Sequence, residues 1–98
     1  MKLFPADGWY VVLALRQRPH VLVLPLVFWG LVGETLRGIL ADLPWMPGGE
    51  RVGEGLCWAD IATDQALFVG YYHAQRTPKE QIHALVQEAI ARGVALGQ

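Results

Sequence analysis

The stretch HVLVLPLVFWGLVG, residues 20–33, restricts the possible folds more than any other part of the chain, because its last thirteen residues are all apolar, glycine or proline. A membrane-spanning helix needs about 20 predominantly apolar residues. Charged residues flank the run at Arg18 and Glu34, and each charge drawn to the bilayer centre would cost about 2.5–3.5 kcal/mol. Pro25 would also interrupt a helix. The run therefore predicts buried β-structure, and a small membrane-associated protein is the least favoured alternative.

The composition indicates one small domain that is rich in apolar residues. The 98 residues are 53% hydrophobic and 17% charged, a high apolar content for a domain with so much surface relative to its volume. We therefore expect a single domain over residues 1–98. The formal net charge of −1 argues against a nucleic-acid partner, which would require a basic face. The single cysteine cannot form an internal disulfide, so we expect a reducing compartment and a cytoplasmic protein.

Residues 77–93 carry the pattern of an amphipathic C-terminal helix. Thr77 is predicted as the N-cap, with Pro78 at the first helical position and Glu80 at the third, which is the arrangement of a capping box. Gly93 is predicted as the C-cap. Apolar residues recur at helical spacing, so one face of the helix should pack on the core. This face consists of Ile82, Leu85, Val86, Ala89 and Ile90.

Upstream of this helix the sequence predicts an antiparallel β-meander of about four strands. β-Branched and aromatic residues are frequent in all four segments, as is typical of strands. The expected class is therefore α+β, a meander followed by one C-terminal helix. The four predicted strands are residues 9–16, 21–32, 35–43 and 66–73.

The segments that connect the predicted strands are interpreted as turns, a loop or a short helix. Gly33 and Glu34 separate two apolar runs, and glycine at the first of two loop positions is typical of a type II′ hairpin turn. The prolines and glycines of residues 44–55 predict a loop, and residues 56–65 are interpreted as a short helix or turn. Residues 33–43 have a second interpretation, which is a helix that ends before Pro44.

The predicted strands are apolar on both of their faces. A strand with one face in water alternates apolar and polar residues, whereas both alternating sets are apolar in residues 9–15 and 21–29. One helix can cover only one face of such a sheet. The other face should meet a second copy, another protein, or the same sheet curled into a small barrel. We expect a homo-oligomer that uses this apolar sheet face, with Val23 or Leu24 in the interface, depending on which alternation faces the helix.

Candidate catalytic and metal-binding groups lack the spacing that would support them. The chain has no serine, which excludes the serine–histidine–aspartate triad. Cys57 could act as a nucleophile with His73 or His83 as base, yet no basic group is predicted beside the thiol. Cys57, Asp60 and Asp64 would share a helical face, but they lack the short paired spacing of zinc sites. We therefore expect no catalytic residue, no metal and no cofactor.

Aromatic residues are the remaining candidates for a ligand pocket or an oligomer interface, where tryptophan and tyrosine are enriched. These candidates are Trp45, Trp58, Tyr71 and Tyr72. The sequence favours a non-enzymatic interaction or assembly module, with itself or another protein as partner. The alternative is a small binding protein whose aromatic-lined cavity holds an apolar ligand.

Overall fold

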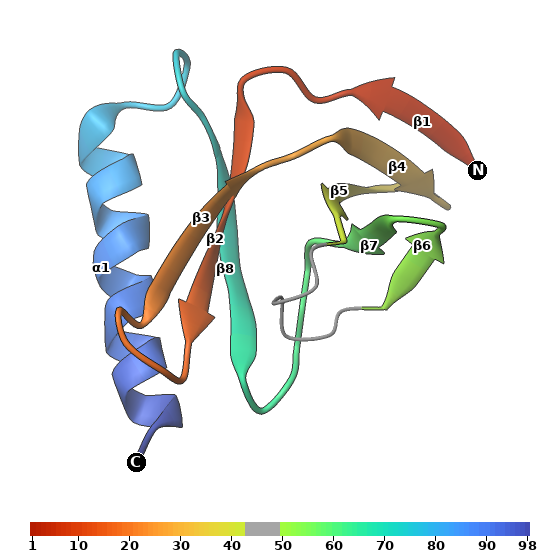
Figure 1. The fold of residues 1–98 in the computed structure, drawn as a ribbon. Helices are drawn as coiled ribbons and strands as arrows, with labels where there is room; N and C mark the ends of the chain where they lie inside the picture. Colours follow the sequence, from red (N-terminus) through yellow and green to blue (C-terminus); the bar gives the residue numbers. More distant parts are fainter. Residues whose placement is uncertain (43–49) are drawn as a thin grey trace.

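The computed structural model describes residues 1–42 and 50–98, and it confirms the α+β class. Antiparallel strands form two sheets, and one helix follows them in the chain (Figure 1). The strands are β1 (Lys2–Pro5), β2 (Trp9–Leu15), β3 (Val21–Pro25), β4 (Phe28–Val32), β5 (Thr35–Ala41), β6 (Arg51–Gly53), β7 (Leu56–Trp58) and β8 (Ala66–His73), and the helix is α1 (Lys79–Leu96). The described residues thus hold more and shorter strands than the sequence predicts.

The two sheets and the helix form three layers. The middle layer is a three-stranded sheet in the order β3-β2-β8. Helix α1 covers one of its faces, and a five-stranded sheet in the order β1-β4-β5-β7-β6 lies on the other side (Figure 1). The middle sheet is therefore covered on both faces by the chain itself.

The long apolar run is divided between the two sheets. The Leu26 amide donates to the Trp9 carbonyl of the middle sheet at 2.9 Å, and the next amide, Val27, donates to the Ile39 carbonyl of the other sheet at 2.8 Å. The prediction of one strand over residues 21–32 is therefore wrong. Pro25 marks this place, since proline within sheets is confined to edge strands and strand ends, and the chain changes sheets directly after Leu26.

Strand β2 lies at the centre of the packing. Val11 and Leu13 face the five-stranded sheet, whereas Val12 and Ala14 face α1, and all four are fully buried. Two apolar cores result, one between the sheets and one under the helix. The expectation of an uncovered sheet face is corrected, because the second sheet of the same chain covers it.

Residues 35–41 form strand β5, so the helical interpretation of this segment is excluded. The hairpin turn before it is confirmed. Val32 pairs with Thr35 across the turn, Gly33 has a φ of +62°, and Glu34 is not among the residues with positive φ. Positive φ at the first loop position alone is the pattern of a type II′ turn.

The helix has the predicted apolar face but different ends. The five predicted core-facing residues are all buried or half-buried. Pro78 is the N-cap, without a side-chain cap, and the Thr77 hydroxyl instead accepts the His73 amide at 2.8 Å. The helix continues through Gly93 to Leu96, so the C-cap is Gly97 and not Gly93. Gly93 instead allows the helix to approach two strand ends closely. A Cβ atom there would lie 2.4 Å from the carbonyl oxygens of Leu15 and His20, so only glycine allows this approach.

Candidate functional site

Strand β3 is an edge of the middle sheet and pairs there with β2 alone. The Leu15 amide bonds the His20 carbonyl, and the Leu26 amide bonds the Trp9 carbonyl, each at 2.9 Å. Hydrogen-bonded pairs alternate along an antiparallel ladder. The main-chain groups of alternate β3 residues therefore point away from β2. These residues are Val21, Val23 and Pro25.

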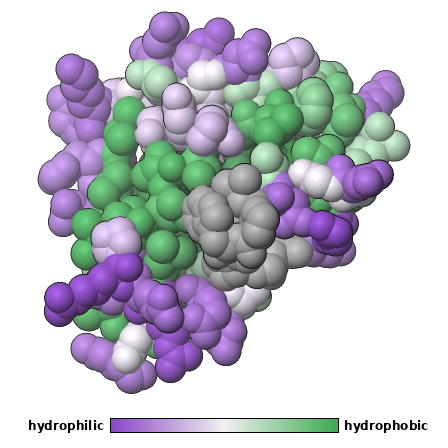
Figure 2. All heavy atoms as spheres, in the orientation of Figure 1, coloured by the Kyte–Doolittle hydropathy of each residue, from purple (hydrophilic) through white to green (hydrophobic). Residues whose placement is uncertain are grey.

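The side chains of β3 divide between the two cores and are incompletely covered in both. Val21 and Val23 pack on the helix side, and Leu22 and Leu24 pack toward the five-stranded sheet. All four are half-buried, and none is charged. Figure 2 shows hydrophobic side chains gathered on the face where β3 lies in front in Figure 1. We name residues 21–25 with these outward main-chain groups the β3 edge.

The other edges of the described sheets are shorter or already bonded. Strand β1 has four residues that include Lys2 and Pro5, and β6 has three residues that begin with Arg51. Charge and proline on an edge oppose pairing with another chain. At the opposite edge of the middle sheet, β8 is bonded only at its two ends, where the Phe68 amide donates to the Ile61 carbonyl at 2.7 Å and the His73 amide donates to the Thr77 hydroxyl at 2.8 Å. The β3 edge is thus the longest uncharged free edge of the described residues.

A second group of exposed apolar side chains lies at the far end of the five-stranded sheet, on both of its faces. It is formed by β1 and by the tip of the β4–β5 hairpin, where the side chains of Val32 and Leu36 are 44% and 51% exposed. We name it the hairpin-tip surface. It consists of Met1, Leu3, Phe4, Val32 and Leu36.

The structure separates the aromatic candidates rather than bringing them together. Trp58 is buried beneath Arg37, whose guanidinium carbon lies 4.1 Å from the ring centroid. Tyr71 lies between the sheets, and its hydroxyl accepts the Gly38 amide at 2.9 Å. Tyr72 lies on the helix side and stacks on Tyr10 with ring centroids 5.3 Å apart. Trp45, the fourth candidate, lies outside the described residues.

The aromatic residues between the sheets pack on one another. Trp29 contacts both Trp9 and Tyr71 edge-on, at centroid distances of 5.4 and 4.8 Å. Phe68 completes the group at 4.7 Å from Tyr71. These rings fill the inter-sheet core, and burial raises the pKa of Tyr71 above its ordinary value.

A cleft of about 230 Å³ lies beside the five-stranded sheet, and its walls are as apolar as they are polar. Arg37 holds Asp60 there through two hydrogen bonds of 2.8 and 2.9 Å. The hydrogen bonding that Arg37 donates to the Asp60 carboxylate raises the pKa of Arg37. Glu50 and Thr63 also line the cleft, and Trp58 is its one aromatic residue among those described. Both partners of the ion pair are already satisfied, so the cleft presents no unpaired charge from this pair to a ligand.

Cys57 and His73 occupy structural positions. Cys57 lies in β7 and is 2% exposed, and burial raises the pKa of its thiol. Because β7 is a strand, the helical face predicted for Cys57, Asp60 and Asp64 does not exist. His73 accepts the amides of Gln75 and Arg76 on its Nδ1 atom at 3.1 and 3.2 Å.

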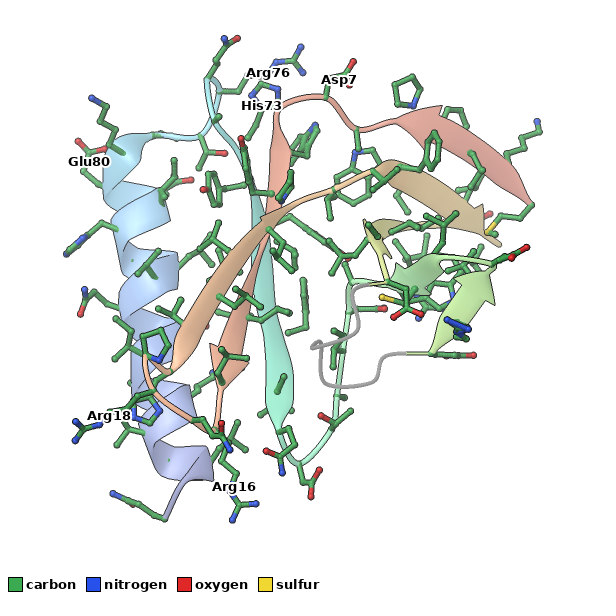
Figure 3. All side chains as sticks on the ribbon, in the orientation of Figure 1. Asp7, Arg16, Arg18, His73, Arg76 and Glu80 are labelled. Atoms are coloured by element: carbon green, nitrogen blue, oxygen red, sulfur yellow. The ribbon has the colours of Figure 1, made fainter. Side chains whose placement is uncertain are left out.

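His73 lies at one end of the middle sheet, where β8 ends (Figure 3). Figure 3 shows His73 near Asp7 and Arg76 at one end of the middle sheet, with Arg16 and Arg18 at the opposite end. The ring lies against Gly8, where a Cβ atom would be 2.7 Å from Nε2. His73 thus fixes the turn between β8 and α1. Residues 1–42 and 50–98 contain no cluster of three or more potential metal ligands.

Comparison of the chain with family models, with curated proteins and with solved structures found no match. No helix among the described residues is both long enough and apolar enough to cross a membrane. The function of the chain is therefore inferred from the geometry of its surface.

Proposed function

We propose that this chain is a non-enzymatic assembly module that associates with copies of itself. The observation that carries the proposal is the β3 edge, where half-buried apolar side chains accompany main-chain groups that no described residue bonds. Free apolar edges recruit further strands, and many proteins therefore blunt them with charge. The β3 edge has no charged residue.

The charge of the chain is compatible with self-association. A formal net charge of −1 gives little repulsion between copies, whereas a strongly charged surface would keep them apart. The same near-neutral charge disfavours a nucleic-acid partner.

We place this assembly in the cytoplasm. Cys57 is the one cysteine of the chain, and it is buried as a free thiol. A protein that is held together without disulfides has no need of an oxidising compartment.

Sedimentation velocity of the purified chain, at micromolar concentration and without detergent, tests the proposal. We expect a dimer or a larger species that dissociates reversibly on dilution. A monomer that stays monodisperse over the whole concentration range would contradict self-association. Light scattering on the same samples gives an independent mass.

A further inference from the structure

We infer that two copies join through an antiparallel pair of β3 strands related by a twofold axis at Val23. The inference rests on the proposed self-association and specifies its interface. The two middle sheets would merge into one six-stranded sheet in the order β8-β2-β3-β3-β2-β8. Because the twofold pairing uses the β3 edge of both copies, this interface closes at two copies.

The outward main-chain groups of the β3 edge are complementary to themselves. With the axis at Val23, the amide and carbonyl of Val23 bond those of Val23 in the second copy. The Val21 amide donates to the Pro25 carbonyl of the second copy, and the symmetric bond forms as well. Pro25 has no N–H group, so it serves here only as an acceptor. The proline therefore limits the edge without preventing this register.

The side chains also match in this register. Leu22 lies opposite Leu24 of the second copy, and Val23 lies opposite its own equivalent. Each of these residues is half-buried in one copy, so pairing would cover apolar surface and bury no charge. Apolar cross-strand neighbours are the units that stabilise such pairs.

Only one register uses the whole strand. An axis at Val23, the middle residue of Val21–Pro25, overlaps all five residues. An axis at Leu22 would also align outward groups, but it would overlap three residues and place His20 opposite Leu24. His20 has a φ of 69°, which is not an extended conformation. The geometry therefore favours the axis at Val23.

Cysteine cross-linking tests this register directly. In a Cys57→Ala background, Val23→Cys would place two thiols in a hydrogen-bonded pair, where Cα atoms lie about 5.5 Å apart. This distance is within the range of a disulfide. We expect mild oxidation to convert most of the Val23→Cys protein to a covalent dimer. Matched variants carry the cysteine at Leu36 on the hairpin-tip surface and at Leu22 on the β3 edge, and neither should cross-link efficiently.

Each outcome separates the two proposals. If the protein sediments as a dimer but Leu36→Cys cross-links in place of Val23→Cys, this interface is wrong and self-association stands. Efficient cross-linking of Leu22→Cys would overturn the register. If the wild-type chain is monomeric, both the interface and the proposed function fail.

A second variant tests the hydrogen bonds. Val23→Pro removes an amide that bonds nothing in the described part of one copy, and proline is tolerated at such edge positions. We expect circular dichroism to show that the variant is folded. We expect its dimer dissociation constant to be raised about 10- to 100-fold by the loss of two hydrogen bonds. A folded Val23→Pro protein with wild-type dimer affinity would overturn the inference.

Discussion

Strands β2 and β3 both lack charged residues, but their surroundings are very different. Both are apolar on both faces, and they pair with each other over five residues. Strand β2 has neighbours on both edges and four fully buried residues, whereas β3 has one neighbour and no fully buried residue. The alternation of side chains thus reports which faces are covered, and it gives no information about which edges are paired.

The largest expected effect contrasts two leucines that face each other across this pair. Leu13 on β2 is fully buried, and its cross-strand partner Leu22 on β3 is half-buried. We expect Leu13→Ala to lower the free energy of unfolding by about 3–5 kcal/mol, and Leu22→Ala to lower it by about half as much. Chemical denaturation at low protein concentration measures both. Equal losses would mean that the β3 edge is as well covered as the centre.

The next prediction concerns the place where the ends of both strands meet the helix. Gly93→Ala should destabilise the protein by about 1–3 kcal/mol, because the new methyl group would meet the carbonyl oxygens of Leu15 and His20. This outcome is opposite to helix propensity, which favours alanine by about 1 kcal/mol. Thermal unfolding of Gly93→Ala decides between them, with the exposed Ala91→Gly as the control for propensity alone. A stabilised Gly93→Ala protein would show that the helix can move away from these strands.

Thiol reactivity sharpens the contrast between interior and edge. Burial raises the pKa of Cys57, so less thiolate is present at a given pH, and access is also restricted. In the native protein at pH 8, Cys57 should react with Ellman's reagent at least about 100-fold more slowly than in the denatured chain. At a concentration where the dimer dissociates, the half-buried thiol of the Val23→Cys, Cys57→Ala protein should react much faster than native Cys57. Fast labelling of native Cys57 would mean that the five-stranded sheet opens readily.

The smallest expected effect is on stability at high pH. Tyr71 and Tyr72, which lie on opposite sides of the middle sheet, both have a pKa raised chiefly by burial. Folding therefore favours the neutral phenols, and this contribution is complete below pH 10 and lost as the pH rises above it. Stability should fall above pH 10, and Tyr71→Phe should reduce that fall. Absorbance titration near 295 nm, native against denatured, measures the two ionisations.

The fold class, the apolar helix face and the hairpin at Gly33 follow from residue patterns that a single sequence contains. The change of sheet at Leu26 and Val27 does not, because both residues continue an apolar run and only Pro25 hints at a break. A single sequence also does not show which strands pair with one another, since β2 and β8 pair through residues more than fifty positions apart.

Two glycines carried a signal that the sequence reasoning did not use. A Cβ atom at Gly30 would lie 2.9 Å from the Trp58 ring, and one at Gly38 would lie 2.7 Å from the Tyr71 ring. An isolated glycine within a strand often marks such a close approach. Glycines at these positions therefore indicate that a bulky side chain lies against each strand. They do not indicate which tryptophan or tyrosine it is. The β3 edge itself could not be predicted, because an unpaired edge depends on where every other strand lies.

The order of strands in the middle sheet has a consequence for synthesis of the chain. Strands β2 and β3 emerge from the ribosome before β4 to β7, whereas β8 and α1, which cover the second edge and one face of β2, follow after them. Until then the β2–β3 hairpin has no cover for its apolar residues from these elements. Such exposed intermediates are prone to aggregate. A nascent chain is therefore expected to depend on chaperone binding to residues 9–25 until β8 and α1 have been made.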